Sequence, residues 1–111
     1  PSGAERLHLQ IEALRLALKA KSGNKDDPYI RDTVGWVYYR MGLFDDAIRE
    51  LEFTVDKIPD NVTANYHLGM AYYKRGDKDK AEESLKKALS LDGKSAHAPE
   101  IKTVIAELEE A

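Results

Sequence analysis

Apolar residues recur along the chain at intervals of three and four positions, with polar residues between them. This spacing places the apolar residues on one face of an α-helix. The pattern predicts helices over residues 5–21, 29–42, 45–57, 63–76, 79–91 and 99–109. We therefore expect an all-α fold.

The chain also repeats itself. Shifted by 34 residues, it matches its own sequence without a gap. The matched residues are Gly35 with Gly69, Tyr38 with Tyr72, Tyr39 with Tyr73, Gly42 with Gly76, Asp45 with Asp79, Ala47 with Ala81 and Leu51 with Leu85. Such a period is typical of arrays in which each repeat is one supersecondary unit. We predict one helix pair over residues 28–61 and a second over residues 62–95.

Glycine and aspartate mark the turn inside each repeat. Gly42 and Gly76 stand where a glycine in the left-handed conformation would end the first helix. Asp45 and Asp79 follow at a place that suits an N-cap or the first turn of the second helix. A turn this short requires the two helices to lie antiparallel.

Each helix pair is predicted to pack closely, because Gly35 and Gly69 carry no side chain that would hold the second helix away. One pair cannot bury its apolar stripe alone, so pairs must stack on one another. Residues 97–110 have an apolar side and a charged side, which predicts a helix that caps the stack. Its apolar side consists of Ile101, Val104, Ile105 and Leu108.

These features together resemble the tetratricopeptide repeat (TPR) family. The matching residues are Gly35 and Gly69 at the eighth position of each repeat, Tyr38 and Tyr72 three positions on, Gly42 and Gly76 in the turn, and Ala47 and Ala81 in the second helix. The resemblance covers residues 5–111. It implies a single domain of stacked antiparallel helix pairs in a right-handed superhelix, with residues 5–21 as the second helix of a partial repeat. The segments around Trp36 and Met70 are similar to those of bacterial members.

The resemblance also implies a function. TPR domains are non-catalytic scaffolds whose first helices line a concave groove for extended peptides or partner helices. The groove residues predicted here are Tyr29, Asp32, Trp36, Tyr39, Arg40, Tyr66, His67, Met70, Tyr73 and Lys74. Chaperone-adaptor TPR domains grip a C-terminal carboxylate with one lysine and two asparagines. The same places hold Asp32, Trp36 and His67, so the resemblance does not extend to that clamp.

Two points on this predicted groove stay open. Trp36 and Tyr66 contact a ligand, act as spacers that pack against each other between adjacent first helices, or do both. Arg40, Lys74 and Arg75 either hold a carboxylate of the ligand or are ordinary cations near a helix C-terminus.

The helix over residues 5–21 carries apolar residues on two sides. The side expected to pack on the next repeat consists of Leu9, Ala13, Leu16, Ala17 and Ala20. The other side consists of Leu7, Ile11, Leu14 and Leu18. A helix that is apolar on nearly all sides expects neighbours on both. The second side is either the place of an absent first helix or a self-association face, through which the chain forms a homodimer or docks on a parent protein.

Composition excludes several classes of function. The chain has 111 residues, no cysteine and a net charge of −3. This length predicts one domain, and without cysteine there is no thiolate zinc site or cysteine nucleophile. The acidic balance argues against nucleic acid as a partner. No apolar run approaches the ~20 residues of a membrane-spanning helix.

Candidate catalytic and metal motifs are incomplete. Gly93-Lys94-Ser95 imitates the end of a phosphate-binding loop, but the earlier glycine that the loop requires is replaced by Ala88. His8, His67 and His97 form no pair at helical spacing for a metal. We therefore predict no enzymatic activity, no metal and no cofactor, and a protein or peptide partner. The absence of an initiator methionine predicts a fragment of a longer protein, whose compartment the sequence leaves open.

Overall fold

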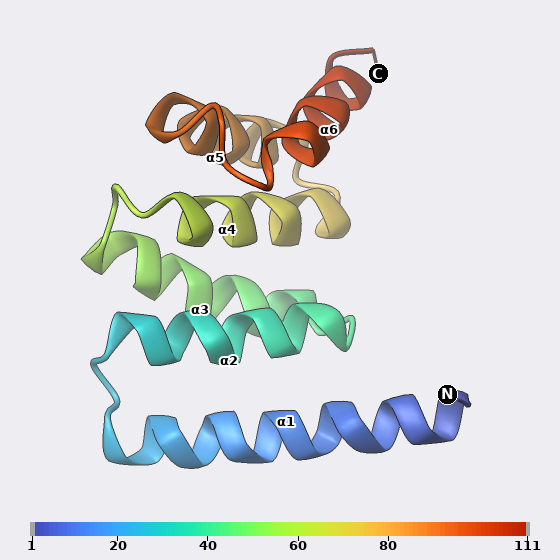
Figure 1. Cartoon of the computed structure of the whole chain (residues 1–111), viewed down its shortest axis with the longest axis vertical. Coiled ribbons are helices and arrows are strands. Elements are labelled where there is room, and N and C mark those ends of the chain that lie inside the picture. The colour runs from blue at the N-terminus through green and yellow to red at the C-terminus, as the bar shows by residue number, and fades with distance from the viewer. Residues whose placement is uncertain (1, 111) are drawn as a thin grey trace.

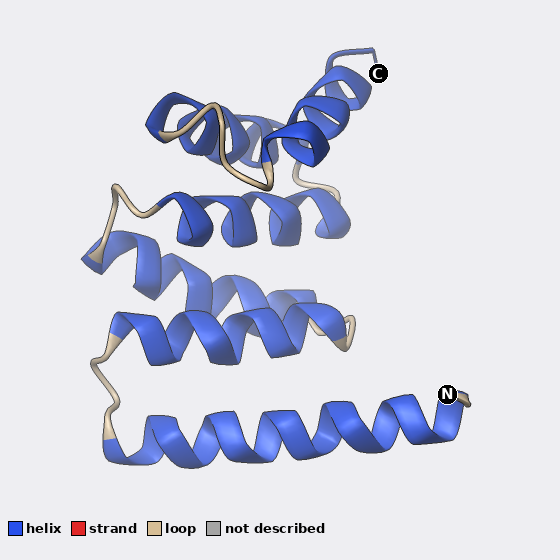
Figure 2. Cartoon of the chain, in the orientation of Figure 1, coloured by secondary structure: helices blue, strands red, loops and turns tan. Residues whose placement is uncertain are grey.

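The computed structural model describes residues 2–110, and all regular structure in that range is helical (Figure 2). The helices are α1 (Gly3–Gly23), α2 (Pro28–Arg40), α3 (Phe44–Lys57), α4 (Val62–Arg75), α5 (Lys78–Leu91) and α6 (Ala98–Glu110). They stack in chain order, with α1 at one end and α6 at the other (Figure 1). The predicted all-α fold of stacked helix pairs is confirmed.

Polar side chains define where three of the helices begin. Ser2, Asp27 and Asn61 are the N-caps of α1, α2 and α4, and each accepts hydrogen bonds from backbone N–H groups of the first turn. These bonds satisfy donors that have no partner inside the helix. Pro28 follows Asp27 at the first helical position, where its missing N–H costs nothing.

The turn inside each repeat is built as predicted. Gly42 and Gly76 have φ of +79° and +94°, the left-handed conformation that a side chain disfavours. Asp45 and Asp79 lie in the first turns of α3 and α5, where a negative charge stabilises the helix dipole. The N-caps of these helices precede the aspartates and make no side-chain hydrogen bond, so only the first-turn role is confirmed.

The two helices of each pair approach closely at a glycine. A Cβ atom added to Gly35 would lie 2.6 Å from Cγ of Leu51, and one added to Gly69 would lie 2.6 Å from Cδ2 of Leu85. Leu51 and Leu85 are both fully buried. The close packing predicted for α2 on α3 and for α4 on α5 is therefore present in both repeats.

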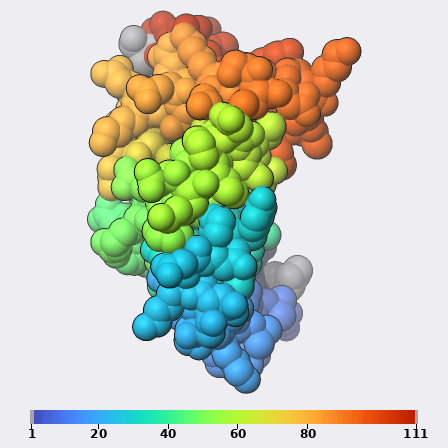
Figure 3. Space-filling model, turned by 90° about the vertical axis from the view of Figure 1, so that its left-hand side faces the viewer, coloured from blue at the N-terminus to red at the C-terminus, as the bar shows by residue number. Residues whose placement is uncertain are grey.

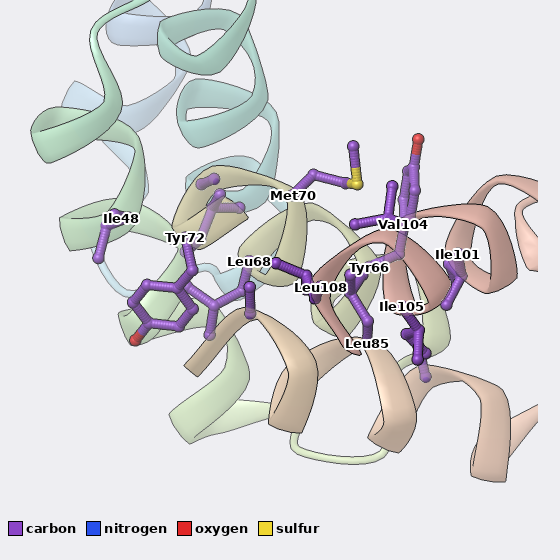
Figure 4. Close-up of a cluster of buried hydrophobic side chains, with 14 of the residues drawn as sticks. Ile48, Tyr66, Leu68, Met70, Tyr72, Leu85, Ile101, Val104, Ile105 and Leu108 are labelled. Atoms are coloured by element: carbon purple, nitrogen blue, oxygen red, sulfur yellow. The ribbon is translucent and has the colours of Figure 1, made fainter. Parts of the chain in front are cut away.

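The core continues from the second repeat into α6 (Figure 4). In this close-up, Met70 and Tyr66 of α4 lie beside Val104 of α6. The whole predicted apolar side of α6 is buried, namely Ile101, Val104, Ile105 and Leu108. The apolar cluster therefore joins α3, α4, α5 and α6 into one body.

Helix α6 also follows the 34-residue register of the repeats. Tyr73 of α4 donates a hydrogen bond of 2.5 Å to Glu107, which lies 34 residues further along the chain. Tyr66 of α4 donates to Glu100 at the same separation. In register, α6 therefore takes the place of the first helix of a third repeat.

A buried carboxylate ties the first three helices together. The side chain of Glu50 on α3 is 8% exposed and accepts hydrogen bonds from Lys21 of α1 at 2.7 Å and from Arg31 of α2 at 2.6 Å. The guanidinium carbon of Arg31 also lies 3.8 Å from the ring centroid of Phe53 on α3. These contacts hold the C-terminal end of α1 against the first repeat.

The stack keeps its order at the surface. In the space-filling view, the atoms run from α1 at one end to α5 and α6 at the other without intermixing (Figure 3). The molecule measures 37 × 34 × 24 Å along its three principal axes. No helix within residues 2–110 has both the length and the hydropathy needed to cross a membrane.

Candidate functional site

The predicted groove residues lie on α2 and α4, the first helices of the two repeats, and most of them are accessible. Tyr29, Arg40 and Lys74 are exposed, and Asp32, Trp36, Tyr39 and Tyr73 are half-buried. We call the four accessible rings, from Tyr29, Trp36, Tyr39 and Tyr73, the aromatic face. The half-buried rings among them pack against the core on their inner side, so the core supports them from below.

Trp36 is the centre of a set of stacked rings. Its ring centroid is 4.3 Å from that of Tyr39, with 6° between the planes, and 3.9 Å from that of His67, with 19°. The Nδ1 atom of His67 lies 2.9 Å from a carboxylate oxygen of Asp32. Trp36 also contacts Tyr66 at 5.7 Å between centroids, which confirms the spacer alternative for this pair. The indole is therefore fixed in place before any ligand arrives.

Three predicted groove residues do not reach the surface. Tyr66, His67 and Met70 are only 6%, 8% and 5% exposed. Trp36 covers His67, while α6 lies over the other two, with the ring of His97 stacked 4.0 Å from that of Tyr66. The prediction that these three side chains line an open groove is therefore wrong, because α6 and Trp36 occupy the space in front of them.

Two buried phenols donate hydrogen bonds to carboxylates. Tyr66 donates to Glu100 of α6, and Tyr72 donates to Glu52 of α3. Burial raises the pKa of both phenols well above the usual value, and the hydrogen bond to the neighbouring carboxylate raises each pKa further. Both effects favour the protonated phenol, so these two contacts between elements depend on neutral tyrosine.

We expect the fold to lose stability as the pH rises above about 10, the ordinary pKa of tyrosine in the unfolded chain. Because folding raises the pKa of Tyr66 and Tyr72, the unfolded chain releases these protons first and is favoured at high pH. Urea unfolding measured from pH 8 to 11 should show a shallower decline for Tyr66→Phe and Tyr72→Phe than for the wild type. The exposed Tyr29→Phe is the control, and an equal decline in all variants would contradict the assignment.

The three predicted cations differ in availability. Arg75 is bound to Asp45 at 3.0 Å and to Asp77, so its role is structural. Arg40 and Lys74 are exposed, and within residues 2–110 neither forms an ion pair with a carboxylate. These two cations are therefore free to meet an acidic group beside the aromatic face.

Helix α1 packs through a side that overlaps the predicted one only at Ala17. Its contact ridge contains Gln10, which donates to the backbone oxygen of Arg40 at 3.1 Å, the buried Ala17, and Lys21. Leu9 and Leu16, which were expected to pack inward, are 63% and 56% exposed. The prediction holds for Ala17 and is wrong for Leu9 and Leu16, because polar residues with hydrogen-bond partners form the rest of the ridge.

The apolar residues of α1 therefore flank the ridge on both sides. The first flank consists of Leu9, Ala13, Leu16 and Ala20, all of them exposed. The second flank is the predicted self-association face, in which Leu7, Ile11 and Leu18 are exposed but Leu14 is half-buried. A cavity of about 310 Å³ opens between the first flank and α2, and its lining includes Leu9, Ala13, Val37 and Arg40.

Sequence reasoning missed the residues in and just before α6 that complete the site. His97 stacks on the ring of Tyr66, while Glu100 and Glu107 accept hydrogen bonds from the hydroxyls of Tyr66 and Tyr73. The signal was present in the sequence, because a shift of 34 residues aligns Glu100 with Tyr66 and Glu107 with Tyr73. The match is hidden because a carboxylate replaces an aromatic ring at each position. Within residues 2–110, no three His, Asp or Glu side chains lie together in a way that would hold a metal ion.

The fold and the repeat register agree with a known family. The sequence profile of the tetratricopeptide repeat matches residues 35–97, more than half of the chain. The chain therefore belongs to the tetratricopeptide repeat family.

Individual proteins are similar to this chain in sequence or in fold. It is 44% identical over 66 residues to the TPR repeat-containing protein PA4667 of Pseudomonas aeruginosa, a match that covers 60% of this chain and 11% of that protein. The chain thus spans about a tenth of the length of this relative. Among solved structures, the first TPR domain of Spaghetti (RPAP3) bound to an HSP90 peptide has a TM-score of 0.81 at 17% identity, covering 94% of this chain and 83% of that one. The Yersinia enterocolitica chaperone SycD with a peptide of YopD has a TM-score of 0.81 at 14% identity, covering 96% and 84%. At these identities the likeness shows the fold.

Proposed function

We propose that this chain is a non-catalytic interaction module that holds a peptide or a partner helix against the aromatic face. The observation that carries the proposal is the fixed, half-exposed set of Trp36, Tyr39 and Tyr73 beside the two free cations Arg40 and Lys74. Tryptophan, tyrosine and arginine are the side chains enriched at binding hot spots. Rings that are already ordered lose little conformational freedom on binding.

Two solved structures of the same fold hold peptides: the RPAP3 domain binds an HSP90 peptide, and SycD binds a peptide of YopD. These structures support a role in binding peptides or partner proteins. The side chains at the clamp positions support a different ligand. Asp32, Trp36 and His67 occupy the three clamp positions and are engaged with one another, so we do not assign a chaperone-tail peptide. The free cations favour a segment with an apolar anchor for the rings and a carboxylate for Arg40 or Lys74.

The sole tryptophan of the chain gives a direct binding signal, because Trp36 lies on the proposed face. We expect a displayed library of peptides with an aromatic or aliphatic anchor next to Asp or Glu to yield binders that change the Trp36 emission. Tyr73→Ala should weaken binding about tenfold to a hundredfold, the range of a hot-spot truncation. The charge reversal Arg40→Glu with Lys74→Glu should select against acidic peptides.

The matched control is Lys57→Glu with Lys87→Glu, which changes the net charge equally on exposed positions of α3 and α5. It should leave peptide binding unchanged. Trp36 supports the fold and is therefore left intact in these tests. Circular dichroism checks that each variant keeps its helices. Peptides that bind the control and the reversed variant equally well would place the binding surface elsewhere.

A further inference from the structure

We infer that the first flank of α1 is the interface of a homodimer in which two copies of α1 pack antiparallel. The flank consists of Leu9, Ala13, Leu16 and Ala20, which fall within about 60° of one another at 100° per residue. They are separated by four, three and four positions, the spacing of a coiled-coil seam. All four are exposed, and the proposal does not depend on the function of the aromatic face.

The repeats of this chain show that the first flank is a helix-binding face. In the 34-residue register, Ala13 and Ala20 correspond to Ala47 and Thr54 of α3, which are fully buried in the first repeat. In the first repeat the second helix meets its own first helix on this side, because the hydroxyl of Thr54 donates a hydrogen bond of 3.0 Å to the backbone oxygen of Pro28 in α2. In α1 the same side faces solvent and borders the cavity of about 310 Å³ beside Val37 of α2.

A helix cannot reach this face through the turn that the repeats use. Both turns contain a glycine with positive φ where the first helix ends, Gly42 and Gly76. The corresponding residue of α1 is His8, which lies inside the helix, and α1 continues for more than a turn before it to Gly3. The short connection that brings α2 onto α3 is therefore not formed at His8.

The first flank is complementary to itself in size. When two α1 helices run antiparallel about a twofold axis at the level of Leu14 and Arg15, Leu9 faces the partner's Ala20, and Ala13 faces the partner's Leu16. Every layer thus pairs one large with one small side chain, which lets the helices interlock. The second flank pairs large with large, and its Leu14 is already half-buried in the fold.

Charge favours the same arrangement. Glu12 and Lys19 border the first flank on the side away from α2, seven residues apart, and Glu12 also pairs with Arg15 of its own helix at 3.0 Å. In the antiparallel pair each Glu12 lies next to the partner's Lys19, so the dimer forms two such attractions by symmetry. The face therefore recognises a second copy of this chain by both shape and charge.

The decisive experiment is sedimentation equilibrium of the 111-residue chain. We expect a dimer, and we expect Leu16→Glu to raise its dissociation constant about a hundredfold, because the new carboxylate would be buried without a partner. Leu18→Glu on the second flank is the matched control and should leave the dimer intact. Circular dichroism confirms that both variants remain helical.

Charge exchange tests the orientation. Glu12→Lys and Lys19→Glu should each weaken the homodimer about tenfold, since like charges then meet twice. Mixed together, the two variants should form a heterodimer in which both pairs attract again. A wild-type chain that stays monomeric would overturn the proposal and assign the face to another helix. Loss of the dimer through Leu18→Glu in place of Leu16→Glu, or a mixture that forms no heterodimer, would overturn it as well.

Discussion

Replacing Glu50 by glutamine is expected to lower the free energy of unfolding by about 2–4 kcal/mol. Removing one member of a buried ion pair typically costs about 3–5 kcal/mol, because the remaining charge stays buried without a partner. The expected value is set lower here because the side chains of Lys21 and Arg31 keep 26% and 16% of their exposure. Water therefore still reaches part of both cations.

The loss should appear first in α1. Within residues 2–110, the charged contact between α1 and the repeats is the ion pair of Lys21 with Glu50. The buried apolar residue of the α1 ridge is Ala17. Few buried contacts make a segment open locally before the whole domain unfolds. In Glu50→Gln, hydrogen exchange of the α1 amides should accelerate more than that of α4.

A surface carboxylate is the control for this experiment. Asp46 pairs with Arg49 one turn away on α3, and both side chains are well exposed. Asp46→Asn should change the free energy of unfolding by no more than about 0.5 kcal/mol, as exposed pairs do. Urea unfolding followed by circular dichroism measures both variants, and equal losses would show that the Glu50 network contributes no more than a surface pair.

The features that the sequence predicted well are local and repeated. Gly42 and Gly76 recur at the same place in both repeats, and each meets a requirement of the backbone that few other residues fulfil. Gly35 and Gly69 likewise each meet one leucine at close range. A requirement that appears twice in the same register can be recognised without knowing the rest of the fold.

The predictions that were wrong concern residues whose surroundings are set by segments distant in the sequence. The exposure of Tyr66 and Met70 is decided by α6, and no periodicity within α4 shows where α6 lies. The side through which α1 packs is decided by the hydrogen bond from Gln10 and the ion pair of Lys21. A pattern of apolar positions overlooks polar residues of this kind, so the prediction included Ala17 of the ridge but otherwise selected exposed residues of the first flank.

Both misses have functional consequences. With Tyr66 and Met70 covered, the accessible part of the predicted groove shrinks to rings on α2 and to Tyr73 of α4, next to Arg40 and Lys74. With the ridge of α1 identified, the first flank becomes an open face equivalent to a buried one in the repeats. We therefore propose two surfaces that adjoin at Arg40, one for a peptide and one for a second copy.

A methyl group added at Gly69 should destabilise the fold, although alanine favours a helix over glycine by about 1 kcal/mol. The new Cβ would lie 2.6 Å from Cδ2 and 2.7 Å from Cγ of Leu85. Leu85 is fully buried within the apolar cluster. Overpacking of this kind costs about 1–3 kcal/mol, so we expect Gly69→Ala to be less stable than the wild type.

A double-mutant cycle separates this clash from other effects. Leu85→Ala alone should cost about 2–5 kcal/mol through the cavity that it leaves. In the double variant the methyl group at position 69 occupies part of that cavity, so its loss should fall short of the sum of the single losses by about 1–2 kcal/mol. Gly23→Ala is the control, because nothing lies within 4 Å of a Cβ at that position. Urea unfolding of the four cycle proteins gives the coupling energy. Strict additivity would mean that the glycine does not set the distance between α4 and α5, and the physical basis of the repeat would then lie in the turns alone.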